Sequence, residues 1–225
     1  MMRTVCNENQ CTGCMACLEA CSQDAITVKD DLKYYNAVID SNKCIDCGAC
    51  HHVCQNNNEI RTTEPIAWYQ GWSKSEKQRS ISSSGGFAAE LSKYFIENGG
   101  IVCSCAFENG VFGFDFAEST EKVEKFKGSK YVKSNPTGIY NKIRDYLKAG
   151  RKVLVIGLPC QIAAVKLFVD KRFKDGLYLV DLICHGTPSP KVLSLFLAEH
   201  GYLVTKIRDI QFRQKGTFNI RKDGV

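Results

Sequence analysis

Eight of the thirteen cysteines fall into two copies of one spacing, C-x₂-C-x₂-C-x₃-C, and the second copy begins 33 residues after the first. The first copy consists of Cys11, Cys14, Cys17 and Cys21, and the second of Cys44, Cys47, Cys50 and Cys54. Bacterial ferredoxins with two [4Fe–4S] clusters use this spacing, and there the fourth cysteine of each copy ligates the other cluster. We therefore expect one cluster, cluster I, to bind Cys11, Cys14, Cys17 and Cys54. We expect the other, cluster II, to bind Cys44, Cys47, Cys50 and Cys21.

Small residues separate these cysteines, which lets the backbone close around a cluster and direct its amides at the sulfides. They are Gly13, Ala16, Gly48 and Ala49. The proline that usually follows the fourth cysteine is replaced by Ser22 in the first copy and by Gln55 in the second. We expect these two replacements to change the local geometry but not the ligation.

Two other uses of closely spaced cysteines, structural zinc and disulfides, fit less well. Structural zinc sites favour two separated C-x₂-C pairs over four cysteines packed this closely. Disulfides need an oxidising compartment, and residues 1–10 contain no apolar segment typical of a signal peptide. The sequence therefore predicts a cytoplasmic protein, and the interrupted apolar stretch at 153–169 predicts no membrane span.

The net charge of +6 is modest and no nucleic-acid-binding motif accompanies it, so nucleic acid is not an expected partner. Part of the positive charge gathers at Lys122, Lys125, Lys127, Lys130 and Lys133. This group is either a solvated face or a site for a phosphate-bearing cofactor or an acidic partner.

The elements that must position the cysteines divide the 225 residues into one small and one medium domain. Residues 1–62 form the predicted two-cluster ferredoxin-like domain, in which residues 25–29 and 34–39 are predicted to be strands joined by a turn. Residues 63–80 form a predicted linker. We expect the two tryptophans of this linker, Trp68 and Trp72, to pack it against the next domain, which is favoured over a role in stacking on a ligand.

Residues 81–225 form the second predicted domain, whose pattern alternates between helices and strands. A serine- and glycine-rich turn at 82–86 opens a helix that ends near Asn98. Two apolar segments on either side of Asn109-Gly110 predict a hairpin. Further helices are expected at 138–148, 161–169 and 190–199, and further strands at 152–156, 177–184 and 206–212. This order predicts an α/β domain with a mixed or mostly parallel sheet, so the fold class of the chain is α+β.

Two polar motifs follow neighbouring strands of this sheet, at the strand ends where ligands of such sheets bind. The first, at 157–161, contains Cys160 at the start of a helix, a position that favours a thiolate. The second, at 183–189, contains Cys184 and His185. Each residue alone is equally well explained as a packed turn residue, but together they favour a site.

With these motifs in place, the chain resembles the family of beta subunits of the coenzyme F-420 hydrogenases and dehydrogenases over nearly its whole length. The segments that carry the resemblance are the double cysteine run and residues 83–86, 127–132, 157–161, 181–186 and 207–215. The resemblance implies two [4Fe–4S] clusters and a flavin, FAD, bound in the domain that follows residue 80. Family members usually continue well past residue 225, so we expect a C-terminally truncated chain.

The resemblance also implies which residues bind the flavin. The predicted cofactor-binding residues are Ser83, Ser84, Gly85, Gly86, Lys130, Pro159, Cys160, Gln161, His185 and Gly186. The motif positions are carried over without individual roles. The catalytic residue stays open, with His185 as a candidate for a general acid or base.

These features predict an iron–sulfur flavoprotein that converts between one-electron and two-electron transfer. Clusters carry single electrons, whereas a flavin can also exchange hydride with a small acceptor such as coenzyme F-420. A redox partner protein or another member of a complex would complete the route. Three alternatives stay open: a ferredoxin-type electron carrier without flavin, an electron-transfer subunit without its own substrate, and a thiol-based reductase that uses Cys160.

Overall fold

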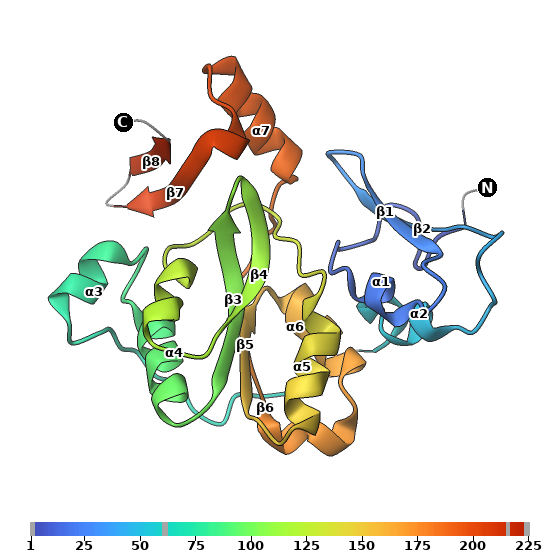
Figure 1. Ribbon diagram of the computed structural model, residues 1–225, viewed down its shortest axis with the longest axis horizontal. Helices are drawn as coiled ribbons and strands as arrows, with labels where there is room; N and C mark the ends of the chain where they lie inside the picture. Colours follow the sequence, from blue (N-terminus) through green and yellow to red (C-terminus); the bar gives the residue numbers. More distant parts are fainter. Residues whose placement is uncertain (1–2, 60–62, 215–216, 223–225) are drawn as a thin grey trace.

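Both cysteine runs lie in a small part of the structure, residues 3–59, beside a larger part built around a four-stranded sheet (Figure 1). The computed structural model describes residues 3–59, 63–214 and 217–222. The predicted boundary after residue 62 therefore lies outside the described residues. In the small part, α1 (Ala16–Ala20) and α2 (Ala49–His52) begin at equivalent alanines of the two runs.

An antiparallel hairpin completes the small part, as the alternating apolar pattern predicted. β1 (Ile26–Asp30) pairs with β2 (Tyr35–Ile39), and Ile26 lies opposite Ile39. The buried face of the hairpin packs against cysteines of both runs, including Cys17 and Cys54. Sulfur atoms therefore make up much of the core of this part.

The sheet of the larger part is mixed, with strand order β4-β3-β5-β6, and this confirms the expected fold class. β3 (Ile101–Glu108) and β4 (Val111–Ala117) form the predicted hairpin. β5 (Val153–Gly157) and β6 (Leu177–Asp181) continue the sheet in parallel with β3. The carboxyl ends of β3, β5 and β6 therefore lie at one edge, which we call the carboxyl edge.

Helices cover both faces of this sheet, with α4 (Phe87–Glu97) on one face and α5 (Ile139–Lys148) and α6 (Pro159–Phe168) on the other (Figure 1). All five residues of β5 are buried, because its alternate side chains point into two separate cores. Leu154 packs with residues of α4, whereas Val155 packs with residues of α5 and α6.

The last predicted strand, at 206–212, does not join the four-stranded sheet, contrary to expectation. β7 (Ile207–Gln214) pairs with β8 (Thr217–Lys222) in a separate antiparallel sheet, beside α7 (Pro190–Glu199). Ile207 and Ile210 are buried against Phe112 of the β3–β4 hairpin. The apolar face of β7 is thus buried against the β3–β4 hairpin and α7. Burial of this face therefore does not require strand pairing with β6. Lys215, at the end of the family-like segment 207–215, lies outside the described residues.

The segment predicted as a linker differs from expectation in two ways. It contains a short helix, α3 (Glu76–Ile81), which Ser75 caps by accepting a hydrogen bond from the amide of Gln78. Trp68 is 86% exposed, so the prediction that it packs against the next domain is wrong. Trp72 is 63% exposed, although its Cβ lies close to Gly85. The sheet domain already covers both its faces with its own helices.

Short 3₁₀ helices fill the remaining connections at Gln55–Asn57, Glu121–Phe126, Lys171–Gly176 and Val204–Lys206. Within the part of the chain that the structure describes, none of the helices has the length and apolar character needed to cross a membrane.

A carboxylate from the small part caps a helix of the large part. Glu19 on α1 accepts hydrogen bonds from the backbone amides of Gly138 (2.6 Å), Tyr140 (3.4 Å) and Asn141 (2.9 Å), at the first turn of α5. These amides have no partner inside their own helix, and a negative charge at this end is favourable. The cap therefore fixes the small part against the sheet domain.

Replacing Glu19 by Gln should lower the free energy of unfolding by about 1–3 kcal/mol, because hydrogen bonds to a charged group contribute that much. Urea unfolding of the anaerobically prepared full chain, followed by circular dichroism, measures this change. Glu8→Gln, which removes an exposed carboxylate of the same part, should leave the unfolding midpoint in place. Equal midpoints for the two variants would contradict the capping role.

Candidate functional site

The two cysteine loops share an unusual backbone conformation at matching positions. Gly13 and Asp46, each one residue before the second cysteine, have φ of 64° and 55°. Met15 and Gly48, each one residue after it, have φ of 62° and 74°. The left-handed region is unfavourable for residues with a side chain. Its repetition indicates that both loops curl in the same way, and the amide of Gly13 accordingly donates to the Cys11 Sγ at 3.4 Å.

Four cysteines from the two runs line one cavity, and they are the four that the spacing assigns to cluster I. The cavity is lined by Cys11, Cys14, Cys17 and Cys54, together with Val5, Cys6, Thr12, Met15, Val28, Ala37 and Asn56. Sequence reasoning gave no role to Cys6. The cavity brings the last cysteine of the second run to the first run, as the crossed ligation of such domains requires.

The protonation chemistry of this cavity fits a cluster. Burial raises the pKa of Cys11 to about 11 and that of Cys54 to about 12, and it raises the pKa of Cys14 and Cys17 as well. Four thiolates close together in a dry cavity are unstable without positive charge. Iron supplies that charge when it binds, so the donor set fits a thiolate-ligated cluster.

The cysteines assigned to cluster II lie nearer to solvent. Cys47 is exposed, and Cys21, Cys44 and Cys50 are half-buried. Burial raises the pKa of Cys50, and the nearby Cys21 and Cys44 add to the rise, which places cysteines of both runs close together. All thirteen cysteines are free thiols. Across residues 3–59, 63–214 and 217–222, no three His, Cys, Asp or Glu side chains are placed to hold a single metal ion.

The loop of cluster I is embedded in the core of the larger part. Cys14 belongs to the same buried cluster as Tyr140 of α5 and Ala164 of α6. The Tyr140 hydroxyl donates a hydrogen bond to the Cys14 carbonyl oxygen. On the same side, the Lys133 ammonium donates to the Cys160 Sγ at 3.3 Å, at the start of α6. Cys160 therefore lies at the junction between the cluster I loop and the carboxyl edge of the sheet.

The Pro-Cys-Gln motif stands where β5 meets α6. Pro159 occupies the first turn of α6, where its missing amide hydrogen is not needed. The Gln161 side chain accepts from the Leu158 amide (2.9 Å) and donates to the Ser134 hydroxyl (3.0 Å). Both ends of this amide are therefore engaged within the chain, and Gln161 shapes the turn at the carboxyl edge.

The Ser-Gly loop lies against the lysine-rich segment that follows β4. The Ser83 hydroxyl accepts a hydrogen bond from the amide of Ser129 at 2.9 Å. Gly86 has φ of 80° and caps α4, and a Cβ at Gly85 would lie only 3.0 Å from the Cβ of Trp72. The two glycines are thus required for the turn and for close approach of the preceding segment.

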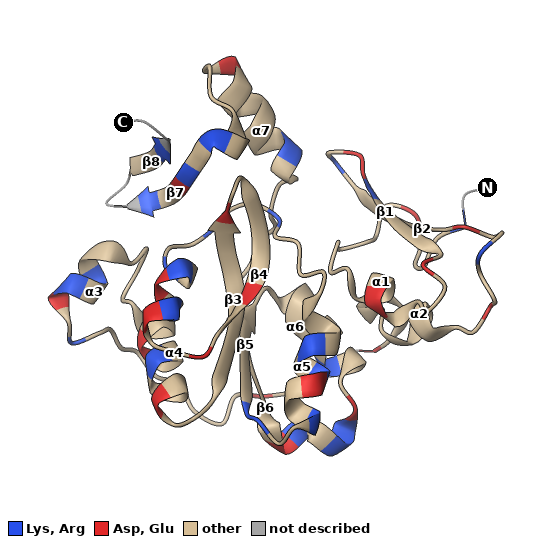
Figure 2. Cartoon of the chain, viewed as in Figure 1, with Lys and Arg blue, Asp and Glu red and all other residues tan. Residues whose placement is uncertain are grey.

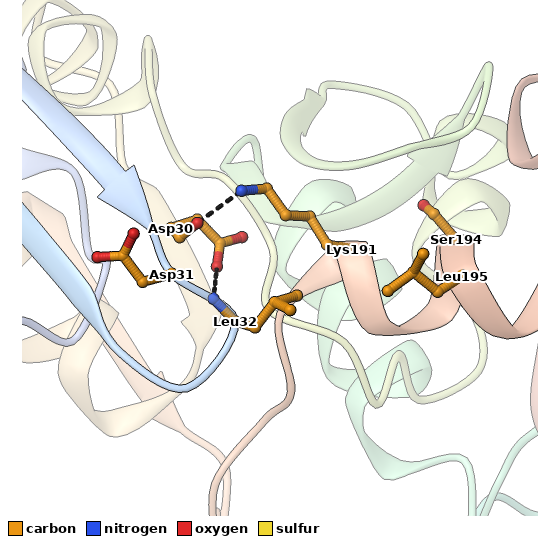
Figure 3. Close-up of a pocket in the computed structure, with 6 residues that line it drawn as sticks. All are labelled: Asp30, Asp31, Leu32, Lys191, Ser194 and Leu195. Atoms are coloured by element: carbon orange, nitrogen blue, oxygen red, sulfur yellow. Dashed lines mark hydrogen bonds between the residues drawn. The ribbon is translucent and has the colours of Figure 1, made fainter.

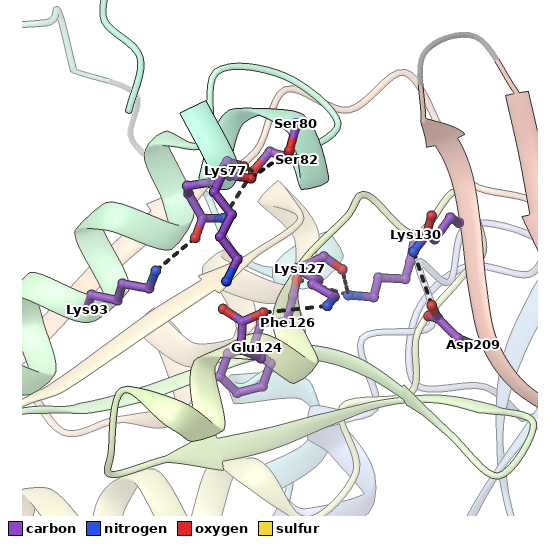
Figure 4. A network of polar contacts seen from close by, with 11 residues as sticks. Lys77, Ser80, Ser82, Lys93, Glu124, Phe126, Lys127, Lys130 and Asp209 are labelled. Carbon is purple, nitrogen blue, oxygen red and sulfur yellow. Dashed lines mark hydrogen bonds and ion pairs between the residues drawn. The ribbon is translucent and has the colours of Figure 1, made fainter. Parts of the chain in front are cut away.

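Lys130, in this segment, has a side-chain pKa well below that of an ordinary lysine. Its ammonium donates to the carbonyl oxygens of Phe126 (2.9 Å) and Lys127 (2.8 Å). Burial lowers the pKa of Lys130 to about 8, although Cys105 and Asp209 nearby oppose the shift. Figure 4 shows Lys77 of α3 and Lys93 of α4 in the same neighbourhood. Figure 2 shows further Lys and Arg on α3, α4 and β7.

The five lysines that stood out in the sequence do not form one face. Lys125 is paired with Asp115 and Lys127 with Glu124 (3.5 Å), whereas Lys133 is directed into the domain junction. Lys130 lies between the Ser-Gly loop and β7, and Lys122 is exposed. Lys130 is thus the member of the group best placed to meet an anionic cofactor.

The second strand-end motif is open to solvent. The chain leaves β6 at Asp181, and His185 and Gly186 lie in the exposed loop that follows. Gly186 has φ of 115° and donates its amide to the Cys184 Sγ at 3.3 Å. Among the described residues, no hydrogen bond joins His185 to another predicted cofactor-binding residue. The structure thus places residues 157–161 and 182–186 at one edge but does not bring His185 into contact with the rest.

Sequence reasoning missed a groove between the β1–β2 hairpin and α7, which Figure 3 shows. It is lined by Asp30, Asp31, Leu32, Lys191, Ser194 and Leu195. The Ser189 hydroxyl donates to the Asp30 carboxylate (2.5 Å), and the Lys191 ammonium donates to the Asp30 carbonyl oxygen (2.5 Å). These two hydrogen bonds join the β1–β2 hairpin to the start of α7, and they form a second contact between the small and the large part. No short-range sequence pattern could have revealed it, because its partners are about 160 residues apart.

Comparisons with known proteins agree with the two parts of the structure. The family described as 4Fe-4S dicluster domain matches residues 10–58. The family described as the C terminus of the coenzyme F-420 hydrogenase/dehydrogenase beta subunit matches residues 150–225. A curated relative, a subunit of the F(420)H(2) dehydrogenase of Methanosarcina mazei, is 25% identical over 185 residues. These residues are 77% of this chain and 53% of the relative, so the chain spans about half the length of the curated relative that it matches.

A solved structure, the F-420-reducing [NiFe] hydrogenase complex from Methanosarcina barkeri, is similar with a TM-score of 0.49 and 21% identity. The similarity covers 68% of this chain and 55% of that chain. The matches in sequence lie in the two regions that carry the resemblance to this family, and each family model covers less than half of the chain.

Pairs of cysteine substitutions test which cysteines share a cluster. Cys14→Ala with Cys54→Ala should remove one cluster and leave about four irons per chain, since the two residues line one cavity. Cys47→Ala with Cys54→Ala should damage both clusters and leave almost no iron. Iron and sulfide quantification after anaerobic purification measures both results. The reverse order would show that each run holds its own cluster, and Cys184→Ala is the control that should keep all the iron.

Proposed function

We propose that this chain is a member of the family of beta subunits of the coenzyme F-420 hydrogenases and dehydrogenases. We propose further that it is an iron–sulfur flavoprotein that works within an oxidoreductase. It would pass electrons between two [4Fe–4S] clusters and FAD, with hydride exchange to coenzyme F-420 or another small acceptor. A redox partner protein would exchange electrons with the clusters. The curated relative is named as part of a dehydrogenase, which favours work in a complex.

The observation that carries this proposal is the burial of the cluster I loop against the carboxyl edge of the sheet. Cys14 packs with α5 and α6, and Cys160 is the second residue of α6, the helix that leaves this edge. Ligands of such sheets bind at this edge. A simple electron carrier needs no such contact, whereas a converter needs its one-electron and two-electron groups held close together.

The residues divide the proposed work between them. Bound clusters supply one-electron transfer, and a bound flavin, stable in three oxidation states, supplies the step between one and two electrons. The eight cysteines would hold the clusters. Lys130 and the Ser-Gly loop would hold the phosphates of FAD, since cations and a helix N-terminus favour anions there. Cys47 and its neighbours would face the external partner, because they lie nearer to solvent than the cysteines of cluster I.

A runner-up function has one specific observation in its favour. The two cavities at Asp30–Leu32 and around Cys11 are lined by none of the predicted flavin-binding residues. An electron-transfer subunit without its own substrate would need no closed cofactor pocket. This alternative keeps the clusters and the partner protein but removes hydride exchange from the chain itself.

The first experiment is anaerobic purification of the full chain, followed by iron, sulfide and flavin quantification with and without added FAD. About eight irons and one flavin per chain would support the converter, and hydride acceptors would then be screened, beginning with coenzyme F-420. About eight irons without flavin would reject the converter in favour of the electron-transfer role alone.

The pH dependence of FAD binding tests the role of Lys130. Its pKa is about 8, so the free protein carries this positive charge at pH 7 and has largely lost it at pH 9. Binding of FAD phosphates at pH 9 then requires proton uptake, and we expect the Kd to rise about tenfold, which corresponds to one charge-assisted hydrogen bond. Flavin fluorescence titration measures the Kd at each pH.

Two variants sharpen this test. Lys130→Arg keeps the charge at both pH values and should remove most of the pH dependence, whereas Lys130→Gln should bind FAD weakly at both. Lys174→Gln, at an exposed lysine beyond α6, should behave as the unmodified chain does. Unchanged FAD affinity in Lys130→Gln would rule out this lysine as a phosphate ligand.

A further inference from the structure

Lys133 stands out at the domain junction because it is a buried lysine. The residue is only 6% exposed. Its backbone amide donates to the Pro188 carbonyl oxygen at 2.9 Å, which fixes its segment against the loop after β6. Lysine is rarely buried without a partner, since removing its charge from water is unfavourable. The burial of this ammonium group therefore needs a physical explanation.

The side chain of Lys133 runs between the cluster I loop and α6. A Cβ placed on Gly13 would lie 3.2 Å from the Lys133 Cε, so the glycine leaves room for this side chain. The ammonium donates to the Cys160 Sγ at 3.3 Å. Burial raises the pKa of Cys14, and the positive charge of Lys133 opposes this rise, which places the charge within electrostatic reach of a cluster I ligand.

Among the described residues, no carboxylate forms an ion pair with this ammonium. In the described part of the chain, none of the ion pairs includes Lys133. The charge is also poorly screened, because water and salt do not reach a buried group as they reach a surface lysine. The Lys133 ammonium will therefore interact strongly with any change of charge beside it.

We propose that Lys133 supplies a fixed positive charge that raises the reduction potential of cluster I. This inference rests on the proposed ligand set of cluster I. Reduction adds one negative charge to a [4Fe–4S] cluster, and a positive charge beside it stabilises the reduced form. Among the described residues, no hydrogen bond joins Lys133 to a cysteine assigned to cluster II, so the reduction potential of cluster II is affected less. Electrons then settle at the domain junction and not at the exposed end of the small part.

Redox titration of the full chain, prepared anaerobically and followed by electron paramagnetic resonance, tests this proposal. In Lys133→Met, one of the two reduction steps should move to lower potential, with a fall of about tenfold in the ratio of reduced to oxidised cluster at a fixed potential (~59 mV for one electron). The other step should stay in place. Lys133→Arg should restore the potential, and Lys148→Met, at the exposed far end of α5, should change neither step.

A second variant reaches the same charge without removing the lysine. Cys160→Asp places a carboxylate at the start of α6, where negative charge is favourable, and opposite the Lys133 ammonium. Partial neutralisation of the lysine should lower the same reduction step. An unmoved potential in both Lys133→Met and Cys160→Asp, with the clusters intact, would overturn the proposal.

The iron and sulfide content of each sample distinguishes a failure of the proposed function from a failure of the role of Lys133. A full chain that binds no iron would reject the proposed function itself. An iron-free Lys133→Met beside an unmodified chain and a Lys133→Arg variant with about eight irons each would show that the lysine acts in assembly, and would also overturn the tuning role.

Discussion

The structure depends on how a short sulfur-rich loop is fastened to the helices of a larger domain. Tyr140 is fully buried, and its hydroxyl satisfies the carbonyl oxygen of Cys14, which would otherwise be an unpaired acceptor in a dry interior. The Tyr140 ring packs against Phe168 of α6 at 5.2 Å between centroids. Glu19 caps α5 a few residues away. The position of Cys14, one of the predicted cluster ligands, is therefore coupled to two helices that line the sheet.

Because of this coupling, we expect metal binding to contribute to the stability of the fold. Met15 and Asp46 hold a left-handed backbone that costs roughly 1–2 kcal/mol per residue with a side chain. The thiols beside them are buried, which disfavours the thiolates that ligation requires. A part of 57 described residues has little hydrocarbon core to offset these terms. Binding of iron would offset them, so cluster assembly and docking onto α5 and α6 would proceed as one event.

Local patterns in the sequence predicted the elements whose partners are near in the chain. The β1–β2 hairpin, the β3–β4 hairpin around Asn109-Gly110 and the bounds of α7 follow from alternation, turn residues and helix signals within about 20 residues of one another. The cysteine spacing likewise grouped the four residues that line one cavity. These inferences need only short-range geometry.

Contacts between distant segments lay beyond such reasoning. β7 was expected in the main sheet, but its apolar face is buried on the β3–β4 hairpin, and nothing in its own pattern specifies which surface it meets. Trp68 and Tyr69 have the composition of a packed segment and yet are exposed. Lys133 looked like one of five surface lysines and is buried beside Cys160. In each case burial is decided by what another part of the chain brings, which composition does not encode.

The two cysteine runs show how a repeated sequence can acquire unequal functions. Their spacing, their left-handed residues and their helices match position for position. Their surroundings do not match, because Cys14 of the first loop is buried beside a buried tyrosine and near a buried lysine, whereas Cys47, at the equivalent position of the second loop, is exposed. Identical ligands in environments of different polarity and charge have different reduction potentials. If both runs bind clusters, the direction of electron transfer between the clusters would therefore depend on the domain that covers one copy and leaves the other near solvent.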